Sequence, residues 1–168
     1  TTGATRDSYR RIQEQALTPE AVTVTLRDNV STGTLDSNGN PLPRFAGHVY
    51  ANTQEGFPAD LNSWEIQIVQ AEVSRPSSIG WYRNPSRPTP AALRIAFQND
   101  AEKWTSLQPD FIVISRRDDL SLAASIVDPH SDHHADARNK LLALADYAEN
   151  HGTAFVRIES ITMVDGVL

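Results

Sequence analysis

Two aspartates stand beside apolar segments in a way that predicts a shared metal site. Asp110 immediately precedes the run at 111–115, and Asp128 ends the run that begins at position 122. Both runs are short and rich in β-branched residues, which is typical of buried strands, and the polar segment 116–119 predicts a hairpin connection between them. In an antiparallel pair the start of one strand lies beside the end of the next, so we expect the two carboxylates to converge at one sheet edge. Carboxylates with room for water are the ligands that Mg²⁺ prefers.

A third acid, Glu65, lies at the start of a predicted helix over 64–73. The segment before it contains Asp60 and Asn62, either of which is suited to cap the helix. Glu65 and Glu72 are two turns apart and therefore share a side of this helix. Glutamates on helices commonly face solvent, which is the plain alternative for both. The apolar face of the helix is expected to comprise Trp64, Ile68, Val69 and Ala71.

Histidines and aspartates are concentrated directly after Asp128. The group comprises His130, Asp132, His133, His134 and Asp136. These residue types bind transition metals, so a zinc site is one interpretation. His133 and His134 are adjacent at a predicted helix start and point about 100° apart, which disfavours joint ligation of one ion. Surface polar residues around a helix cap are the other interpretation.

The remaining elements would frame these residues in an α/β (α+β) domain over 44–168. Its further elements are expected as strands at 45–50, 79–84, 92–97 and 155–161 and a helix at 133–149. Residues 1–43 are expected to form an arm or linker that packs on this domain, and no chemistry is assigned to them. Within the arm we expect a helix over 5–17, a strand over 21–26 and a loop whose tip is 36–40.

Composition narrows the class of protein. The 168-residue chain has no cysteine, which excludes disulfides and thiolate zinc sites, and its formal net charge is −6. An acidic balance disfavours a free-standing nucleic-acid binder, although arginines cluster at 75–94 and 116–117 and allow a local basic face. No apolar run approaches the ~20 residues of a membrane span and no signal peptide is visible, so we expect a cytoplasmic location. The chain opens without methionine, and we expect it to be part of a larger polypeptide.

Five segments together resemble the nuclease domain of the PD-(D/E)xK superfamily. They are Trp64-Glu65, the aromatic strand end at 81–85, the Pro-Asp run at 109–113, the segment 126–130, and Lys140. The similarity is greatest to the C-terminal nuclease module of type III restriction and phage-defence helicase subunits. It implies a restriction-endonuclease-like core, with a central mixed sheet of about five strands flanked by two helices. No glycine-rich nucleotide loop and no nucleophilic serine or cysteine motif competes with this interpretation.

The resemblance implies a Mg²⁺- or Mn²⁺-dependent endonuclease site formed by Glu65, Asp110, Asp128 and His130. The three acids would bind the metal, and His130 would take the place of the family's lysine. The family has Glu or Asp, any residue, then Lys at its third motif, whereas this sequence has Asp128-Pro129-His130. A histidine donates a hydrogen bond or acts as a base near neutral pH, but it is not a fixed positive charge. Candidates for contacting DNA are Arg83, Arg87, Arg116 and Lys140.

Two further functions stay open at this point. The domain could keep the nuclease fold and serve as a non-catalytic DNA-binding or docking module of a helicase. The histidine in the third motif and the net charge of −6 favour that alternative. A histidine-rich transition-metal domain is the third. The partners expected for the first two functions are DNA and the helicase or ATPase region of the same parent chain, with no membrane.

Overall fold

The computed structural model describes residues 33–50, 55–87, 89, 91–129 and 137–162. The helix expected over 5–17 and the strand expected over 21–26 lie outside these residues. The same holds for His130 and for the cluster Asp132, His133, His134 and Asp136. The loop tip at 36–40 is described and is a tight turn, in which the Asp36 carboxylate accepts hydrogen bonds from the Asn38 and Asn40 amides at 2.8 Å each.

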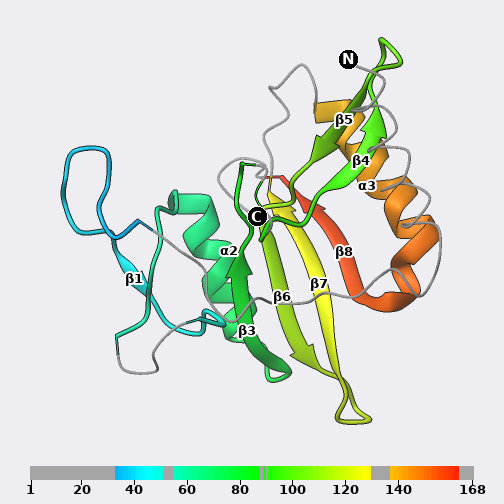
Figure 1. Cartoon of the computed structure of the whole chain (residues 1–168). Coiled ribbons are helices and arrows are strands. Elements are labelled where there is room, and N and C mark those ends of the chain that lie inside the picture. Colours follow the sequence, from blue (N-terminus) through cyan, green and yellow to red (C-terminus); the bar gives the residue numbers. More distant parts are fainter. Residues whose placement is uncertain (1–32, 51–54, 88, 90, 130–136, 163–168) are drawn as a thin grey trace.

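A four-stranded mixed sheet forms the centre of the molecule (Figure 1). Its strands, in spatial order, are β3 (Ser78–Arg83), β6 (Phe111–Arg116), β7 (Leu122–Pro129) and β8 (Phe155–Ile161). The first three pair antiparallel, and β8 pairs with β7 in parallel. The expected mixed sheet with two helices is confirmed, and the number of strands is four where the sequence predicted about five.

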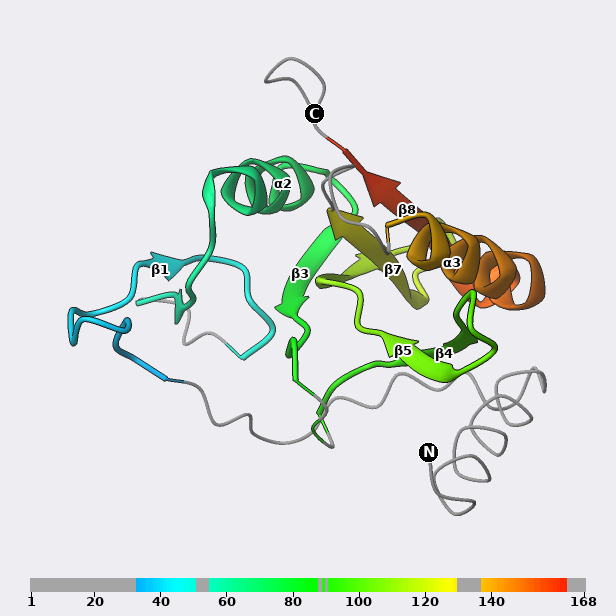
Figure 2. The same ribbon diagram turned by 90° about the horizontal axis from the view of Figure 1, so that it is seen from above.

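The helices α2 (Ser63–Val73) and α3 (Ala137–His151) lie on opposite faces of this sheet (Figure 2). Alternation along the strands separates two cores, because successive side chains point to opposite faces. On the α2 face, Trp81 and Phe111 pack with Ile68 and Val69 of the helix. On the α3 face, a second set of strand side chains packs with the helix: Tyr82, Ile112, Ala124, Ile126 and Phe155 with Leu144.

The hairpin of β4 (Ile95–Gln98) and β5 (Trp104–Leu107) is a separate two-stranded sheet that follows β3 and leads into β6. The expected strand at 92–97 therefore belongs to this hairpin rather than to the central sheet, and β5 was not predicted. A turn built on Asn99 connects the two strands, with its carboxamide oxygen accepting from two backbone amides at 3.1 Å each. The hairpin packs against α3.

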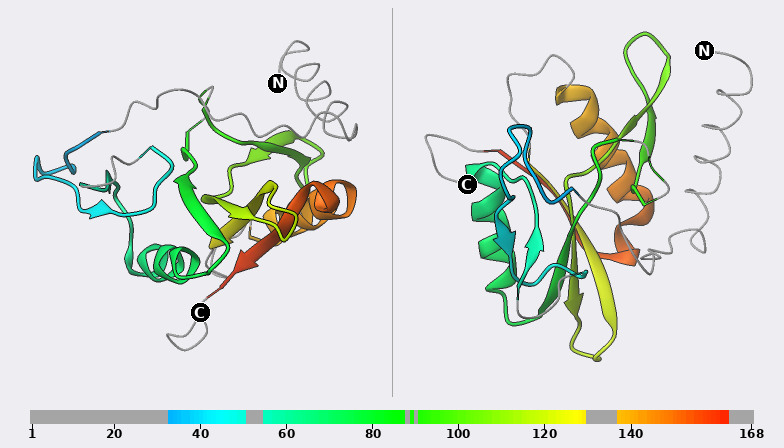
Figure 3. Two further views of the ribbon diagram at one scale, coloured as in Figure 1. Left: turned by 90° about the horizontal axis from the view of Figure 1, so that it is seen from below. Right: turned by 60° about the vertical axis from the view of Figure 1, so that its left-hand side comes forward.

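The edge of β3 is covered by the segment that precedes α2. Two short strands, β1 (Arg44–Phe45) and β2 (Phe57–Pro58), pair antiparallel beside α2 and β3 (Figure 3). The strand expected at 45–50 is wrong, because β1 ends at Phe45 and the chain then runs irregularly along β3. There the Trp81 amide donates to the Gly47 carbonyl at 2.9 Å. This close approach requires glycine at position 80, where a Cβ would lie 2.8 Å from the Gly47 carbonyl oxygen.

Candidate active site

Two acidic side chains contact Arg83, the last residue of β3, and a third lies beside them. Its guanidinium Nη2 lies 2.6 Å from Oε1 of Glu65, and Nη1 lies 2.8 Å from Oδ1 of Asp110. The Asp110 backbone amide donates a 3.0 Å hydrogen bond to Oδ1 of Asp128. One end of the sheet thus brings together the helix acid and the two strand-end acids that the sequence singled out.

The register of β6 and β7 explains why Asp110 and Asp128 meet. Phe111 pairs with Val127, so the residue before β6 lies beside the residue that follows Val127. This is the convergence expected from the two apolar runs, and it follows from antiparallel pairing. Asp128 is 5% exposed, so its carboxylate is held in the interior and aimed by the Asp110 amide.

Glu65 is positioned by the start of α2. Asn62 caps the helix, accepting from the Trp64 and Glu65 amides at 2.9 and 3.0 Å, and the Asn62 amide donates to Glu65 Oε2 at 2.7 Å. This reciprocal capping box fixes one carboxylate oxygen, and the other faces Arg83. The helix therefore presents a buried acid. Its expected apolar face is wrong in part, since the buried side chains are Glu65, Ile68, Val69 and Glu72, while Trp64 is half-buried and Ala71 exposed.

Arg83 is held from three sides. Besides the two carboxylates, Nη1 donates to the Asp110 carbonyl at 3.3 Å, and the guanidinium carbon lies 4.9 Å from the centre of the Phe111 ring. Guanidinium groups suit such sites because they are planar, permanently charged and weakly hydrated. Arg83 was expected to contact DNA, and the structure places it as the cation of the carboxylate cluster.

The donor set fits a hard divalent ion, because carboxylate oxygens are what Mg²⁺ and Mn²⁺ prefer. As the side chains stand, no three histidine or acidic groups in the described part of the chain are arranged to hold an ion. Arg83 instead pairs with two of the three carboxylates. Glu65, Asp110 and Asp128 would hold a metal after the guanidinium has moved away from them.

Asn84 has a role that the sequence reasoning missed. It is 1% exposed, and its side chain donates to the Leu93 and Pro109 carbonyls at 3.0 and 2.7 Å and accepts from the Leu93 amide at 2.7 Å. Its backbone amide donates to the Asp110 carbonyl at 2.9 Å. Asn84 thereby ties both ends of the hairpin to β3 and sets the backbone of Asp110. The run Arg83-Asn84-Pro85 could have indicated this role, because a polar pair at the end of an aromatic strand usually has a structural function.

His48 packs against β3 close to Arg83. Its ring is 4% exposed and stacks on Phe57 with 3.6 Å between ring centroids. Burial lowers the pKa of His48 from its usual 6.5 to about 4, so the imidazole is neutral at physiological pH. The Arg83 and Tyr50 amides point at its two ring nitrogens at 3.3 and 3.2 Å. A neutral imidazole has a single acceptor nitrogen, so it accepts from one of these amides at a time.

The other sequence-predicted contacts are distributed more widely. Arg87 is exposed in the loop after β3, and Lys140 lies half-buried in the first turn of α3. Arg116 is exposed at the far end of β6, about 17 Å from the Asp110 end for a strand of this length. His130 lies outside the described residues. The structure therefore groups Glu65, Asp110, Asp128 and Arg83, and separates Arg116 from them.

Comparisons with known proteins connect the chain to one family. No solved structure matches it. No helix among the described residues is long and apolar enough to cross a membrane. Protein YagJ of Escherichia coli (strain K12) is 36% identical over 166 residues, which cover 97% of this chain and 68% of that protein. The YagJ family matches residues 46–168, which include every acid of the cluster, and the chain belongs to the YagJ family.

Proposed function

We propose that this chain is a metal-dependent nuclease domain of the PD-(D/E)xK type that hydrolyses DNA phosphodiester bonds. The observation that carries the proposal is the meeting of Glu65, Asp110 and Asp128 at one end of the sheet. Two of these carboxylates pair with one cation, Arg83, and the third accepts a hydrogen bond from the Asp110 amide, and such a group of oxygen ligands suits a divalent ion. From the resemblance alone, we extend the proposal to cytoplasmic DNA as substrate and to a helicase region of the parent chain as partner.

The order of elements supports this assignment. A helix, three antiparallel strands, a second helix and a parallel strand occur in the order α2, β3, β6, β7, α3 and β8, with the β4–β5 hairpin inserted between β3 and β6. The restriction-endonuclease-like core implied by the sequence has the same order, with a helix ahead of a mixed sheet and another ahead of the last strand. Asp110 of the Pro-Asp pair immediately precedes the second of these strands, and Asp128 of the third motif lies near the end of the third.

The residues of the acid cluster would have different roles in phosphodiester hydrolysis. Asp110 and Asp128, with Glu65 beside them, would supply oxygen ligands to a divalent ion. When bound there, such an ion would polarise the scissile phosphate and lower the pKa of a water molecule. Arg83 releases the carboxylates and turns its guanidinium to the phosphate, because guanidinium groups bind both anions through paired hydrogen bonds. His130 occupies the sequence position of the family's lysine and would donate a proton or a hydrogen bond near neutral pH.

A cleavage assay tests the proposal. Plasmid and linear DNA are incubated with the chain and either Mg²⁺ or Mn²⁺, alongside Asp110→Asn. The matched control is Asp118→Asn, which alters an exposed aspartate in the turn at the far end of β6. We expect cleavage by the wild type and by Asp118→Asn, and loss of cleavage in Asp110→Asn and in EDTA. No cleavage by the wild type, alone or within its parent chain, would overturn the proposal.

A second candidate function has its own supporting observation. Arg83 already neutralises Glu65 and Asp110, as an ion would, which favours a non-catalytic nuclease-fold module for DNA binding or docking within a helicase. Calorimetric titration with Mn²⁺ separates the two functions. The nuclease predicts binding that Asp128→Asn weakens, whereas the module predicts no binding at these acids.

A further inference from the structure

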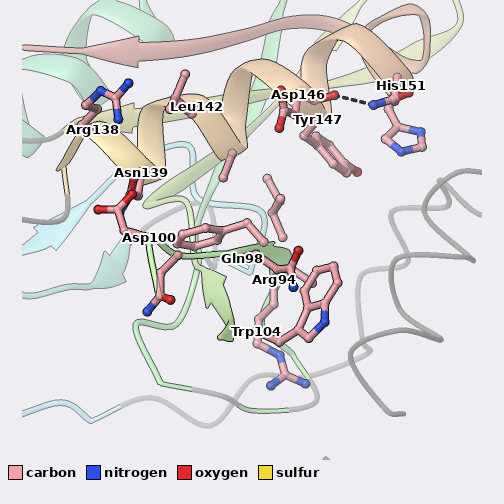
Figure 4. Close-up of a pocket in the computed structure, with 16 residues that line it drawn as sticks. Arg94, Gln98, Asp100, Trp104, Arg138, Asn139, Leu142, Asp146, Tyr147 and His151 are labelled. Atoms are coloured by element: carbon pink, nitrogen blue, oxygen red, sulfur yellow. Dashed lines mark hydrogen bonds between the residues drawn. The ribbon is translucent and has the colours of Figure 1, made fainter. Parts of the chain in front are cut away.

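A cavity of about 390 Å³ lies between α3 and the β4–β5 hairpin (Figure 4). It is separate from the carboxylate cluster, and none of the four cluster residues lines it. Tyr147 and His151 extend into it from α3, while Trp104 and Arg94 come from the hairpin side. Its volume falls within the range of about 300–1,000 Å³ that is typical of small-molecule sites.

The imidazole of His151 offers hydrogen-bonding groups to a ligand in this cavity. The residue is 4% exposed and lines the cavity. Its ring nitrogens make no hydrogen bond to a described residue, and no fully buried side-chain nitrogen or oxygen in that part of the chain lacks a partner, so these nitrogens are accessible from the cavity. An imidazole whose nitrogens open onto a cavity can form hydrogen bonds to a polar ligand atom there. Burial lowers the pKa of His151, so the ring is neutral and offers one donor and one acceptor.

Aromatic side chains define the shape of the ligand. The Tyr147 ring is fixed between His151 and Phe155, with centroid separations of 4.7 and 5.9 Å. Trp104 is half-buried and makes no ring contact or side-chain hydrogen bond with the described residues. An indole face that is available at a cavity wall favours a flat, π-rich ligand.

The charges at the cavity fit a ligand that joins a neutral ring to phosphates. Arg94 and Arg138 line it, and neither forms an ion pair with a described residue. Of the two aspartates there, Asp100 accepts a 3.0 Å hydrogen bond from Asn139, and Asp146 is exposed. The two aspartates balance the two arginines in formal charge, but no ion pair joins them. Both guanidinium groups are therefore available to bind anions. Guanidinium groups bind phosphate well because of their paired donors.

We propose that this cavity binds one unpaired nucleobase of a single-stranded nucleic acid. The base stacks on Trp104 and hydrogen-bonds to His151, and the adjacent phosphates contact Arg94 and Arg138. Unpaired bases are recognised in this way, by aromatic stacking together with hydrogen bonds to the base edge. The choice of nucleic acid as ligand rests on the proposed function.

The hairpin connects this cavity to the carboxylate cluster. Strand β5, which carries Trp104, ends at Leu107, three residues before Asp110. Asn84 binds the carbonyl groups of both Leu93 and Pro109, so the two ends of the hairpin are fixed next to Arg83. A base held in the cavity would therefore be anchored on the same rigid unit that positions the acids.

The test measures binding in EDTA, so that it does not depend on cleavage. Fluorescence anisotropy with a labelled single-stranded oligonucleotide is recorded for the wild type, Trp104→Ala, Arg94→Ala and the control Arg117→Ala, an exposed arginine in the β6–β7 turn. We expect Trp104→Ala to weaken binding at least about fivefold, because one stacked base contributes on the order of 1–3 kcal/mol. Arg94→Ala should weaken binding and reduce its salt dependence, whereas Arg117→Ala should match the wild type. Thermal melting confirms that each variant is folded.

Three results would overturn the inference. They are wild-type affinity in Trp104→Ala and Arg94→Ala, preference for duplex over single strand, and equal binding of a mononucleotide and the oligonucleotide. Failure of this inference and failure of the proposed function are distinguished on the wild type, because single-strand binding is measured in EDTA and cleavage is measured in Mg²⁺. Binding without cleavage would contradict only the proposed function, and cleavage without the expected effects of Trp104→Ala and Arg94→Ala on binding would contradict only this inference.

Discussion

Removing the charge of Arg83 tests how the acid cluster is held together. Arg83→Met keeps much of the apolar stem and removes the guanidinium that contacts Glu65 and Asp110. The Glu65 side chain is 8% exposed, and those of Arg83 and Asp110 are 25% and 26% exposed. Breaking a fully buried pair costs about 3–5 kcal/mol because the remaining charge is left unpaired. Because Arg83 and Asp110 are partly exposed, the cost is smaller here, and we expect Arg83→Met to lower the free energy of unfolding by about 2–3 kcal/mol.

Addition of metal should reverse the loss. Without Arg83, Mn²⁺ no longer competes with a guanidinium for the carboxylates, and an ion at 100 times its Kd would add about 2.7 kcal/mol. The wild type should gain less at the same Mn²⁺ concentration, because its Arg83 must first be displaced. Urea denaturation in EDTA and in Mn²⁺ measures both quantities, with Arg117→Met as an exposed control that should change stability by less than about 0.5 kcal/mol. Wild-type stability of Arg83→Met, or a stability loss that Mn²⁺ does not reduce, would refute this reasoning.

Three further predictions concern the surroundings of the site. The pKa of His48 is about 4 when folded and 6.5 when unfolded, so stability should be complete above pH 6.5 and fall by up to about 3 kcal/mol as the pH drops to 4. Urea denaturation at pH 7, 5.5 and 4 should show this loss, and His48→Phe should flatten it. Asn84→Ala leaves backbone groups at both ends of the hairpin without partners, so it should lower the free energy of unfolding by about 2–4 kcal/mol in urea denaturation. A loss below about 0.5 kcal/mol would contradict the role of Asn84 in fixing the hairpin. Glu72→Gln weakens the ion pair of Glu72 with Arg157. It should lower stability by only about 1–2 kcal/mol in thermal melts, because Glu159 also pairs with Arg157 at 3.1 Å. An unchanged stability would show that Glu159 alone is enough to pair Arg157.

The central hairpin could be predicted because its signals are local. Two apolar runs joined by four polar residues define β6 and β7, and antiparallel pairing then places Asp110 beside Asp128. The start of α2 was predictable for the same reason, since Asn62 and Glu65 have the spacing of a capping box. In both cases a few neighbouring residues determine the geometry.

The rest depends on partners far apart in the sequence. Glu65 and Glu72 are buried because Arg83 and Arg157, on β3 and β8, neutralise them, and no periodicity within α2 reveals a partner on another strand. The hairpin was misassigned because β5 has only four residues, three of them half-buried, and thus lacks the alternation of a strand on a core. Arg83 was expected to contact DNA, because its pairing with Glu65 and Asp110 arises only when distant segments meet in the fold.

The most direct test of a cation site among Glu65, Asp110 and Asp128 is anomalous X-ray scattering from crystals soaked in Mn²⁺. We predict an anomalous peak from a Mn²⁺ ion bound by the carboxylates of Asp110 and Asp128, together with a shift of the Arg83 guanidinium away from Glu65 and Asp110. Saturating Mn²⁺ that gave no peak at these acids and left both Arg83 ion pairs intact would contradict a cation site here.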